Sequence, residues 1–143
     1  MKKLTAILCA ACLMLTAMTG CAKQNNPGQG SGSLSSSDGM IALITMDSID
    51  QHWITLNEGA QKAAGELGVT VQFMSPNTKD DAQQIECVNN AVSAGAKAII
   101  VAANGPDAIS SALKEAKDKG VKIVYVDSPA NVEAEATFST DNK

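Results

Sequence analysis

The side chains that could bind a small molecule stand in three short polar segments, each of which follows an apolar run. These segments are residues 47–53, 103–107 and 127–131. The first contains Asp50 and Trp53, the second begins near Asn104, and the third begins with Asp127. Carboxylates accept hydrogen bonds, an amide both donates and accepts them, and an indole offers a flat apolar face. This set suits the binding of a neutral polar molecule better than bond cleavage.

The sequence offers little for covalent or cofactor chemistry. His52 is the single histidine, and it stands in a different repeating unit from Cys87, so we expect no Cys–His pair. The segment after the first apolar run lacks a GxGxxG pattern, and no GxxxxGK phosphate loop occurs. No cysteine and histidine cluster has metal-ligand spacing. We therefore expect a protein that is not an enzyme and has no cofactor or metal.

Composition favours one soluble α/β domain. The chain has 143 residues, of which 45% are hydrophobic and only 3% aromatic, and Ala, Val, Ile and Leu supply most of its apolar volume. Layered α/β proteins are filled with such side chains. The net charge of −4 and the lack of any Arg argue against binding to nucleic acid.

Periodicity predicts a parallel sheet with flanking helices. The four apolar runs expected to be strands are Met40–Met46, Val69–Met74, Lys97–Ala102 and Val121–Val126. Helical spacing predicts helices over 54–67, from about residue 80 to 94, and from about 105 to 119, each closed by a glycine. Such repeated units give right-handed crossovers, and we expect the first and third strands to be neighbours. The three polar segments would then meet at the carboxyl edge, where ligands bind in such sheets.

The first 39 residues are typical of an export signal and a tether. Two lysines precede the apolar run Leu4–Ala17, which is shorter than the about 20 residues that span a membrane. The small residues before Cys21 resemble a bacterial lipobox, which implies a signal peptide over 1–20 and acylation of Cys21. An ordinary secretory signal and an uncleaved anchor are the alternatives. Residues 22–39 are rich in Gly, Ser, Asn and Gln and predict a flexible linker, so we expect an exported protein that is lipid-anchored to the outer face of a bacterial membrane.

Four segments also carry a family resemblance. They are Asp50–Trp53 followed by Asn57–Gln61, Ala91–Asn104, Tyr125–Ser128, and Thr140–Asn142. In this order and spacing they resemble the first lobe of the periplasmic sugar-binding proteins of the ribose/galactose type, which have two Rossmann-like lobes and serve ABC importers. The resemblance implies that residues 40–139 form a flavodoxin-like N-terminal lobe and that 140–143 begin the crossing into a second lobe, which is missing here.

The resemblance implies a monosaccharide or a similar polyol as ligand. A sugar ring has apolar C–H faces and a rim of hydroxyl groups, so Trp53 would stack on a face. Asp50 and Asp127 would accept hydrogen bonds from hydroxyl groups, and Asn104 would donate or accept. His52 stands where the family often has an aromatic residue.

Ser128 stands where the ribose-binding members have Arg after the aspartate, which argues against ribose itself. Asp at position 50 favours a hexose.

Structural roles remain open for the same residues. Trp53 would instead pack on its own helix, and Asp127 would bind a backbone N–H. Asp50 would be a solvated carboxylate, and Asn104 would cap the helix that follows it. His52 would simply be exposed.

The leading hypothesis is a lipid-anchored receptor that passes a sugar to an ABC permease in the membrane. One alternative is a receptor that presents its ligand to a membrane chemosensor, and another is an exported enzyme on a flavodoxin-like scaffold. Family members have about twice the folded length found here, so we interpret the chain as a fragment. We therefore expect an apolar sheet surface to be exposed where returning segments normally cover it.

Overall fold

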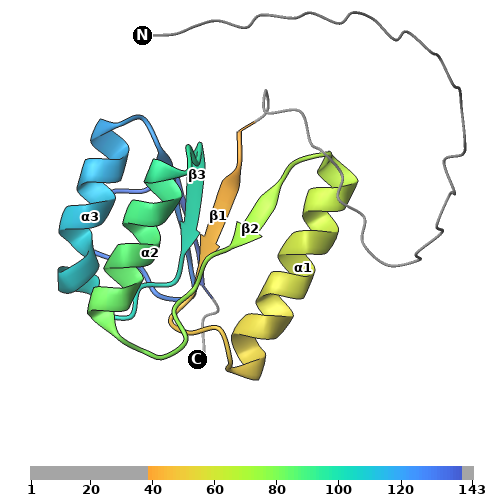
Figure 1. Ribbon diagram of the computed structural model, residues 1–143, viewed down its shortest axis with the longest axis horizontal. Coiled ribbons are helices and arrows are strands. Elements are labelled where there is room, and N and C mark those ends of the chain that lie inside the picture. Colours follow the sequence, from red (N-terminus) through yellow and green to blue (C-terminus); the bar gives the residue numbers. More distant parts are fainter. Residues whose placement is uncertain (1–38, 140–143) are drawn as a thin grey trace, which may run out of the picture. The chain divides into compact units, whose positions relative to one another are not determined.

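The apolar runs form a parallel sheet of five strands in the computed structural model, which describes residues 39–139 (Figure 1). The strands are β1 (Ile41–Ile44), β2 (Val71–Phe73), β3 (Ala98–Val101), β4 (Lys122–Val126) and β5 (Ala136–Phe138). The helices are α1 (Gln51–Leu67), α2 (Asp81–Ser93) and α3 (Pro106–Asp118). The predicted α/β class with a parallel sheet and flanking helices is confirmed.

The strand order is β2-β1-β3-β4-β5, and every pair is parallel. The expected pairing of the first and third strands is confirmed, with Ile44 opposite Val101 at their carboxyl ends. Strand β5 lies beyond the four predicted strands. It has only three residues, two of them exposed, and so lacks the apolar run by which the other strands are recognised.

Capping residues decide where the helices begin. Helix α1 begins at Gln51 and not at residue 54, because the Asp50 carboxylate accepts the backbone N–H of His52 at 3.0 Å. His52 and Trp53 therefore stand in the first turn of a helix and not in a loop. The N-cap of α3 is Gly105, which is followed by Pro106 and makes no side-chain cap bond, so the suggestion that Asn104 caps this helix is wrong.

One face of the sheet is closely packed. Figure 1 shows α2 and α3 side by side on this face and α1 on the other. Ile44, Ile99, Val101 and Ile123 are completely buried there, against the apolar sides of α2 and α3. Strand alternation sends every second residue to this face.

The opposite face is only partly covered. Ile100, Val124 and Val126 are half-buried, and Phe138 is 66% exposed. A hollow of about 670 Å³ separates α1 from β3 and is lined by Leu43, Ile100 and six residues of α1, including Leu56 and Ala60. The expectation of an exposed apolar sheet surface is confirmed for the described residues.

The predictions for the signal peptide (1–20), Cys21 with its linker (21–39) and the crossing segment (140–143) fall almost entirely outside the described residues. Between residues 39 and 139, no helix has the length and apolar character needed to cross a membrane.

The two faces of β4 differ in burial, which predicts different sensitivity to a buried hydroxyl group. We expect Ile123→Thr to lower the free energy of unfolding by about 2–4 kcal/mol, because it leaves a cavity and buries a hydroxyl. Val124→Thr on the half-buried face should cost less than about 1 kcal/mol. Urea denaturation followed by circular dichroism measures both variants. An equal loss for the two would mean that the face of Val124 is covered as well.

Candidate functional site

The loop after β1 is organised by a buried carboxylate. Asp47 is only 4% exposed, and its Oδ1 accepts the backbone N–H groups of Ile49 at 3.0 Å and Asp50 at 2.7 Å. Thr45 Oγ1 donates to the carbonyl oxygen of Asp47 at 2.6 Å. Asp47 is therefore committed to shaping the loop, whereas Asp50 is exposed and uses one oxygen on the helix cap.

The loop after β3 is held by α2. The Asn104 backbone N–H donates to Gln84 Oε1 at 2.9 Å, and the Asn104 side-chain amide donates to a carboxylate oxygen of Asp81. This leaves the Asn104 Oδ1 as the side-chain atom available to accept a hydrogen bond from a ligand. Gly105 packs so closely on Asp81 that a Cβ there would lie 2.6 Å from the carboxylate, and a larger residue would require the Asp81 side chain to move.

The end of β4 turns sharply at Asp127. Its φ of 64° is the one positive value among non-glycine residues of the described chain. Its N–H donates to the Phe138 carbonyl at 2.8 Å, and the Ser128 hydroxyl donates to its carboxylate at 2.9 Å. Ser128 in turn accepts the N–H of Ala103 at 2.9 Å through its backbone carbonyl. A left-handed non-glycine residue carries backbone strain and often marks a functional position.

A cavity of about 480 Å³ opens at this end of the sheet. Its lining residues come from α1, β4 and the end of β5: His52, Leu56, Val126, Asp127, Thr137, Phe138 and Ser139. Its size falls in the range of small-molecule sites. Of the six residues suggested by the sequence, the cavity brings together His52 and Asp127, which supply an aromatic ring and a carboxylate.

The other suggested residues do not line this cavity or the larger apolar hollow. Asp50 caps α1, Asn104 faces Asp81, and Ser128 supports Asp127. The cavity also uses residues that the sequence analysis did not single out for binding, namely Leu56 and Thr137–Ser139. Leu56 belongs to the apolar stripe of its helix, whereas β5 gave no signal in the sequence.

Trp53 is buried beneath the first turn of α1. It is 4% exposed, and its ring meets His52 edge-on, with 4.5 Å between the ring centres and 73° between their planes. In the described part of the chain its Nε1–H finds no hydrogen-bond partner. Stacking on a sugar stays a prediction for Trp53, and the ring that this structure places against open space is that of His52.

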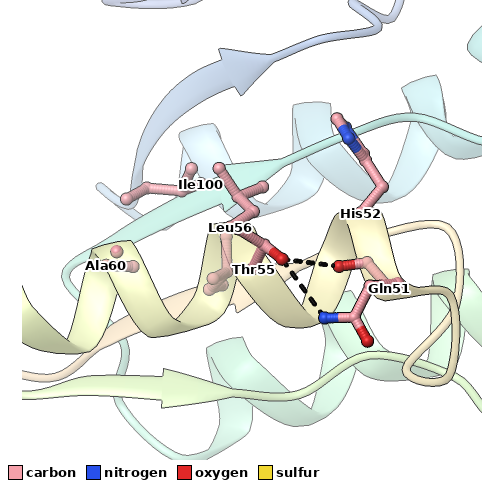
Figure 2. Close-up of a pocket in the computed structure, with 8 residues that line it drawn as sticks. Gln51, His52, Thr55, Leu56, Ala60 and Ile100 are labelled. Atoms are coloured by element: carbon pink, nitrogen blue, oxygen red, sulfur yellow. Dashed lines mark hydrogen bonds between the residues drawn. The ribbon is translucent and has the colours of Figure 1, made fainter.

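The larger hollow shares His52 and Leu56 with the cavity. Figure 2 shows Leu56 beside Ile100 of β3, while Gln51 and Thr55 are hydrogen-bonded to each other along the helix. Its walls are mainly aliphatic, so it offers a ligand few polar partners. The cavity at Asp127 is the more polar of the two and is therefore the better candidate for a binding site.

The described residues hold no group of three or more side chains that would bind a metal ion. Burial, and next the neighbouring Glu86 carboxylate, raises the pKa of the half-buried Cys87 thiol above its usual value. A thiol with a raised pKa is a poor nucleophile at neutral pH.

Comparison with known proteins agrees with this architecture. Residues 41–143 match the family described as periplasmic binding protein domain. The chain belongs to this family. As a periplasmic binding protein it is 37% identical over 95 residues to the D-apiose import binding protein of Actinobacillus succinogenes, which covers 66% of this chain and 30% of that protein.

Two further relatives support the same fold. The ribose import binding protein RbsB of Haemophilus influenzae is 28% identical over 127 residues, which is 89% of this chain and 38% of that protein. A carbohydrate transporter solute binding protein from Agrobacterium radiobacter, solved in complex with D-arabinose, has a TM-score of 0.70 and 30% identity over 76% of this chain and 37% of its own. The chain thus spans about a third of the length of the curated relatives it matches, 30% and 38%.

Substitution of Trp53 separates packing from ligand stacking. We expect Trp53→Ala to lower the free energy of unfolding by about 3–5 kcal/mol, because it leaves a large cavity under α1. Trp53→Phe keeps an aromatic ring and removes the unpartnered N–H, so the loss should be about 1 kcal/mol or less. Chemical denaturation followed by circular dichroism measures both. Two variants as stable as the original chain would show that Trp53 is not a packing residue.

Proposed function

We propose that this periplasmic binding protein is the N-terminal lobe of an exported solute-binding lipoprotein that binds a monosaccharide or a similar polyol and delivers it to an ABC permease. The cavity formed by His52 and Asp127 at the carboxyl edge of the sheet is the observation that carries this proposal. The relatives named for D-apiose and ribose import, and the neighbour solved with D-arabinose, support the choice of a sugar.

The residues around the cavity have the chemistry that a sugar requires. The exposed His52 ring would lie against the apolar C–H face of the sugar, with Leu56 and Phe138 as further apolar walls. The Asp127 carboxylate would accept hydrogen bonds from adjacent hydroxyl groups, and such charge-assisted bonds are about twice as strong as neutral ones. The Ser128 hydroxyl already donates to this carboxylate and holds it in place.

Asp50 and Asn104 would complete the rim when the sugar is bound. The second oxygen of Asp50 and the Oδ1 of Asn104 are the acceptors left over by the helix cap and by Asp81. Trp53 would act beneath His52, as the support of its ring. In this assignment Trp53 contributes to binding through the position of His52.

Strong binding requires a second lobe. This chain matches 30% and 38% of its curated relatives, and two-lobed binding proteins trap their ligand by hinge closure. A micromolar complex has about 8 kcal/mol of binding free energy, and half of that gives only millimolar affinity. The lobe alone would therefore bind sugar weakly, and the permease would recognise the closed two-lobed form.

Substitutions of Asp127 test the proposed sugar site while preserving the turn at the end of β4. Asp127→Gly removes the carboxylate but suits the positive φ, so we expect unchanged or slightly higher stability and at least about tenfold weaker sugar binding, equivalent to ~1.4 kcal/mol. Asp127→Asn keeps the shape and tolerates this backbone conformation, so its loss should be smaller.

Isothermal titration of the full-length gene product with D-apiose, D-ribose and D-arabinose measures these effects. Binding of a sugar with the same affinity to the Asp127→Gly variant would place the site elsewhere.

Cys21 tests the lipid anchor. We expect Cys21→Ser to move the protein from the membrane fraction to the soluble extracytoplasmic fraction, because the acyl chains on Cys21 would be what holds the acidic chain at the membrane. Fractionation and immunoblotting of cells that produce each form measure this change, with Cys87→Ser as the matched control. Retention of the Cys21→Ser variant in membranes would rule out the lipobox.

A further inference from the structure

We propose that Gln84 is the positioning residue of the binding edge: its side-chain amide fixes the loop after β1 and the loop after β3 relative to each other. The consequence for sugar affinity rests on the function proposed above, whereas the structural role does not. Neither the family resemblance nor the cavity pointed to this residue, which stands on α2 outside the cavity lining.

The Gln84 side-chain amide joins α2 to the loop after β1 and to the loop after β3. It is completely buried, and its Nε2 donates to the carbonyl oxygens of Thr45 at 2.9 Å and Ala102 at 2.8 Å. Its Oε1 accepts the N–H of Asn104 at 2.9 Å. Both amide protons and the amide oxygen are therefore used, one on the loop after β1 and two on the loop after β3.

These bonds lie at the carboxyl edge of the sheet, just beyond the last backbone hydrogen bond between β1 and β3. The last bond between β1 and β3 is donated by the Ala102 N–H to the Ile44 carbonyl at 3.0 Å. Beyond it, the carbonyls of Thr45 and Ala102 would be buried without a partner, which is unfavourable. The Gln84 amide supplies hydrogen bonds to both carbonyl groups where the backbone ladder ends. The positions of the two loops relative to each other are therefore fixed.

Through these three bonds Gln84 also restrains the candidate binding residues Asp50 and Asn104. Thr45 passes it on through its hydroxyl, which donates to the backbone of Asp47, the residue that shapes the loop up to Asp50. On the other loop, Asp81 holds the side chain of the same Asn104 whose backbone is held by Gln84. Asp81 and Gln84 are three residues apart and so share one face of α2.

A polar side chain is needed at this position because two backbone carbonyl groups and one backbone N–H converge on it. Gln84 is completely buried, and a leucine or methionine of similar size would fill the space but leave these backbone groups without a partner. Polar groups buried in a core are compensated only when every partner is satisfied, and all three bonds are present here. We infer that the amide is needed for loop geometry.

Substitutions that keep the size of Gln84 test the role. Gln84→Met removes all three bonds. Gln84→Glu keeps the acceptor for Asn104 N–H but, when ionised, turns a carboxylate toward two carbonyl oxygens. When protonated, it regains one donor. The exposed neighbour Gln83 supplies the matched control, Gln83→Glu.

Amide hydrogen exchange of the full chain, read by NMR, is the first measurement. We expect at least tenfold faster exchange at Asn104 and at Asp50 in Gln84→Met, with no change at the centre of α3. In Gln84→Glu the carbonyl contacts should be lost above neutral pH and partly restored as the pH falls through the raised pKa of the buried Glu. The other ionisable groups on these segments, Asp47 and Asp81, are equally present in Gln83→Glu, which corrects for their titration.

Native exchange at Asn104 in Gln84→Met would overturn the proposal. So would an increase spread evenly over the whole domain, which is the mark of simple destabilisation, or a Gln84→Glu profile that follows that of Gln83→Glu at every pH.

Titration of the full-length gene product with D-apiose, D-ribose and D-arabinose is the second measurement. We expect Gln84→Met to weaken binding by about tenfold or more, and Gln84→Glu to recover part of this loss at low pH relative to Gln83→Glu. If the unsubstituted protein binds none of the three sugars, these three pentoses fail as ligands, while the exchange data still decide the role of Gln84.

Discussion

The parallel pairing of β1 with β3 is the constraint on which the rest of this domain depends. It brings the carboxyl ends of two strands that are far apart in the sequence to one edge, with Ile44 opposite Val101. Parallel strands leave their connections on the sheet faces, so the loops at this edge are free to carry polar side chains. Beyond the last ladder bond, the buried Gln84 amide binds both loops. The proposed binding edge is therefore set by the register of two strands and completed by the Gln84 side chain.

The α1 helix connects the packing of the domain to the proposed site. Its N-cap Asp50 fixes where the helix begins, which places His52 toward the cavity and Trp53 toward the interior. The two rings touch edge-on, so the buried indole supports the exposed imidazole. At the opposite wall, Asp127 is held in a left-handed conformation by backbone bonds at its N–H and by Ser128. Local strain is tolerated there because the surrounding hydrogen bonds determine the turn.

Sequence periodicity predicted four of the five strands, because their apolar runs and the helix-ending glycines carry strong local signals. Gly68, Gly95 and Gly120 all adopt positive φ, as a helix-ending glycine does. The periodicity did not reveal β5, whose strand character comes from its bonds to β4. The sequence favoured stacking by Trp53 and not by His52, because which of two neighbouring aromatic side chains faces the interior depends on where the helix begins. Gln84 was equally invisible, because a glutamine on a helix is ordinarily a solvated residue.

The partly covered sheet face bears directly on the site. Leu56 lines both the apolar hollow and the polar cavity, and His52 stands between them. Any segment that filled the hollow would pack on Leu56 and on Ile100, and would thereby restrict the first two turns of α1. Apolar burial is worth about 25 cal/mol per Å², so closing such a surface contributes appreciable stability. Covering this face and fixing the aromatic wall of the cavity are consequently coupled, because Leu56 and His52 belong to both cavities.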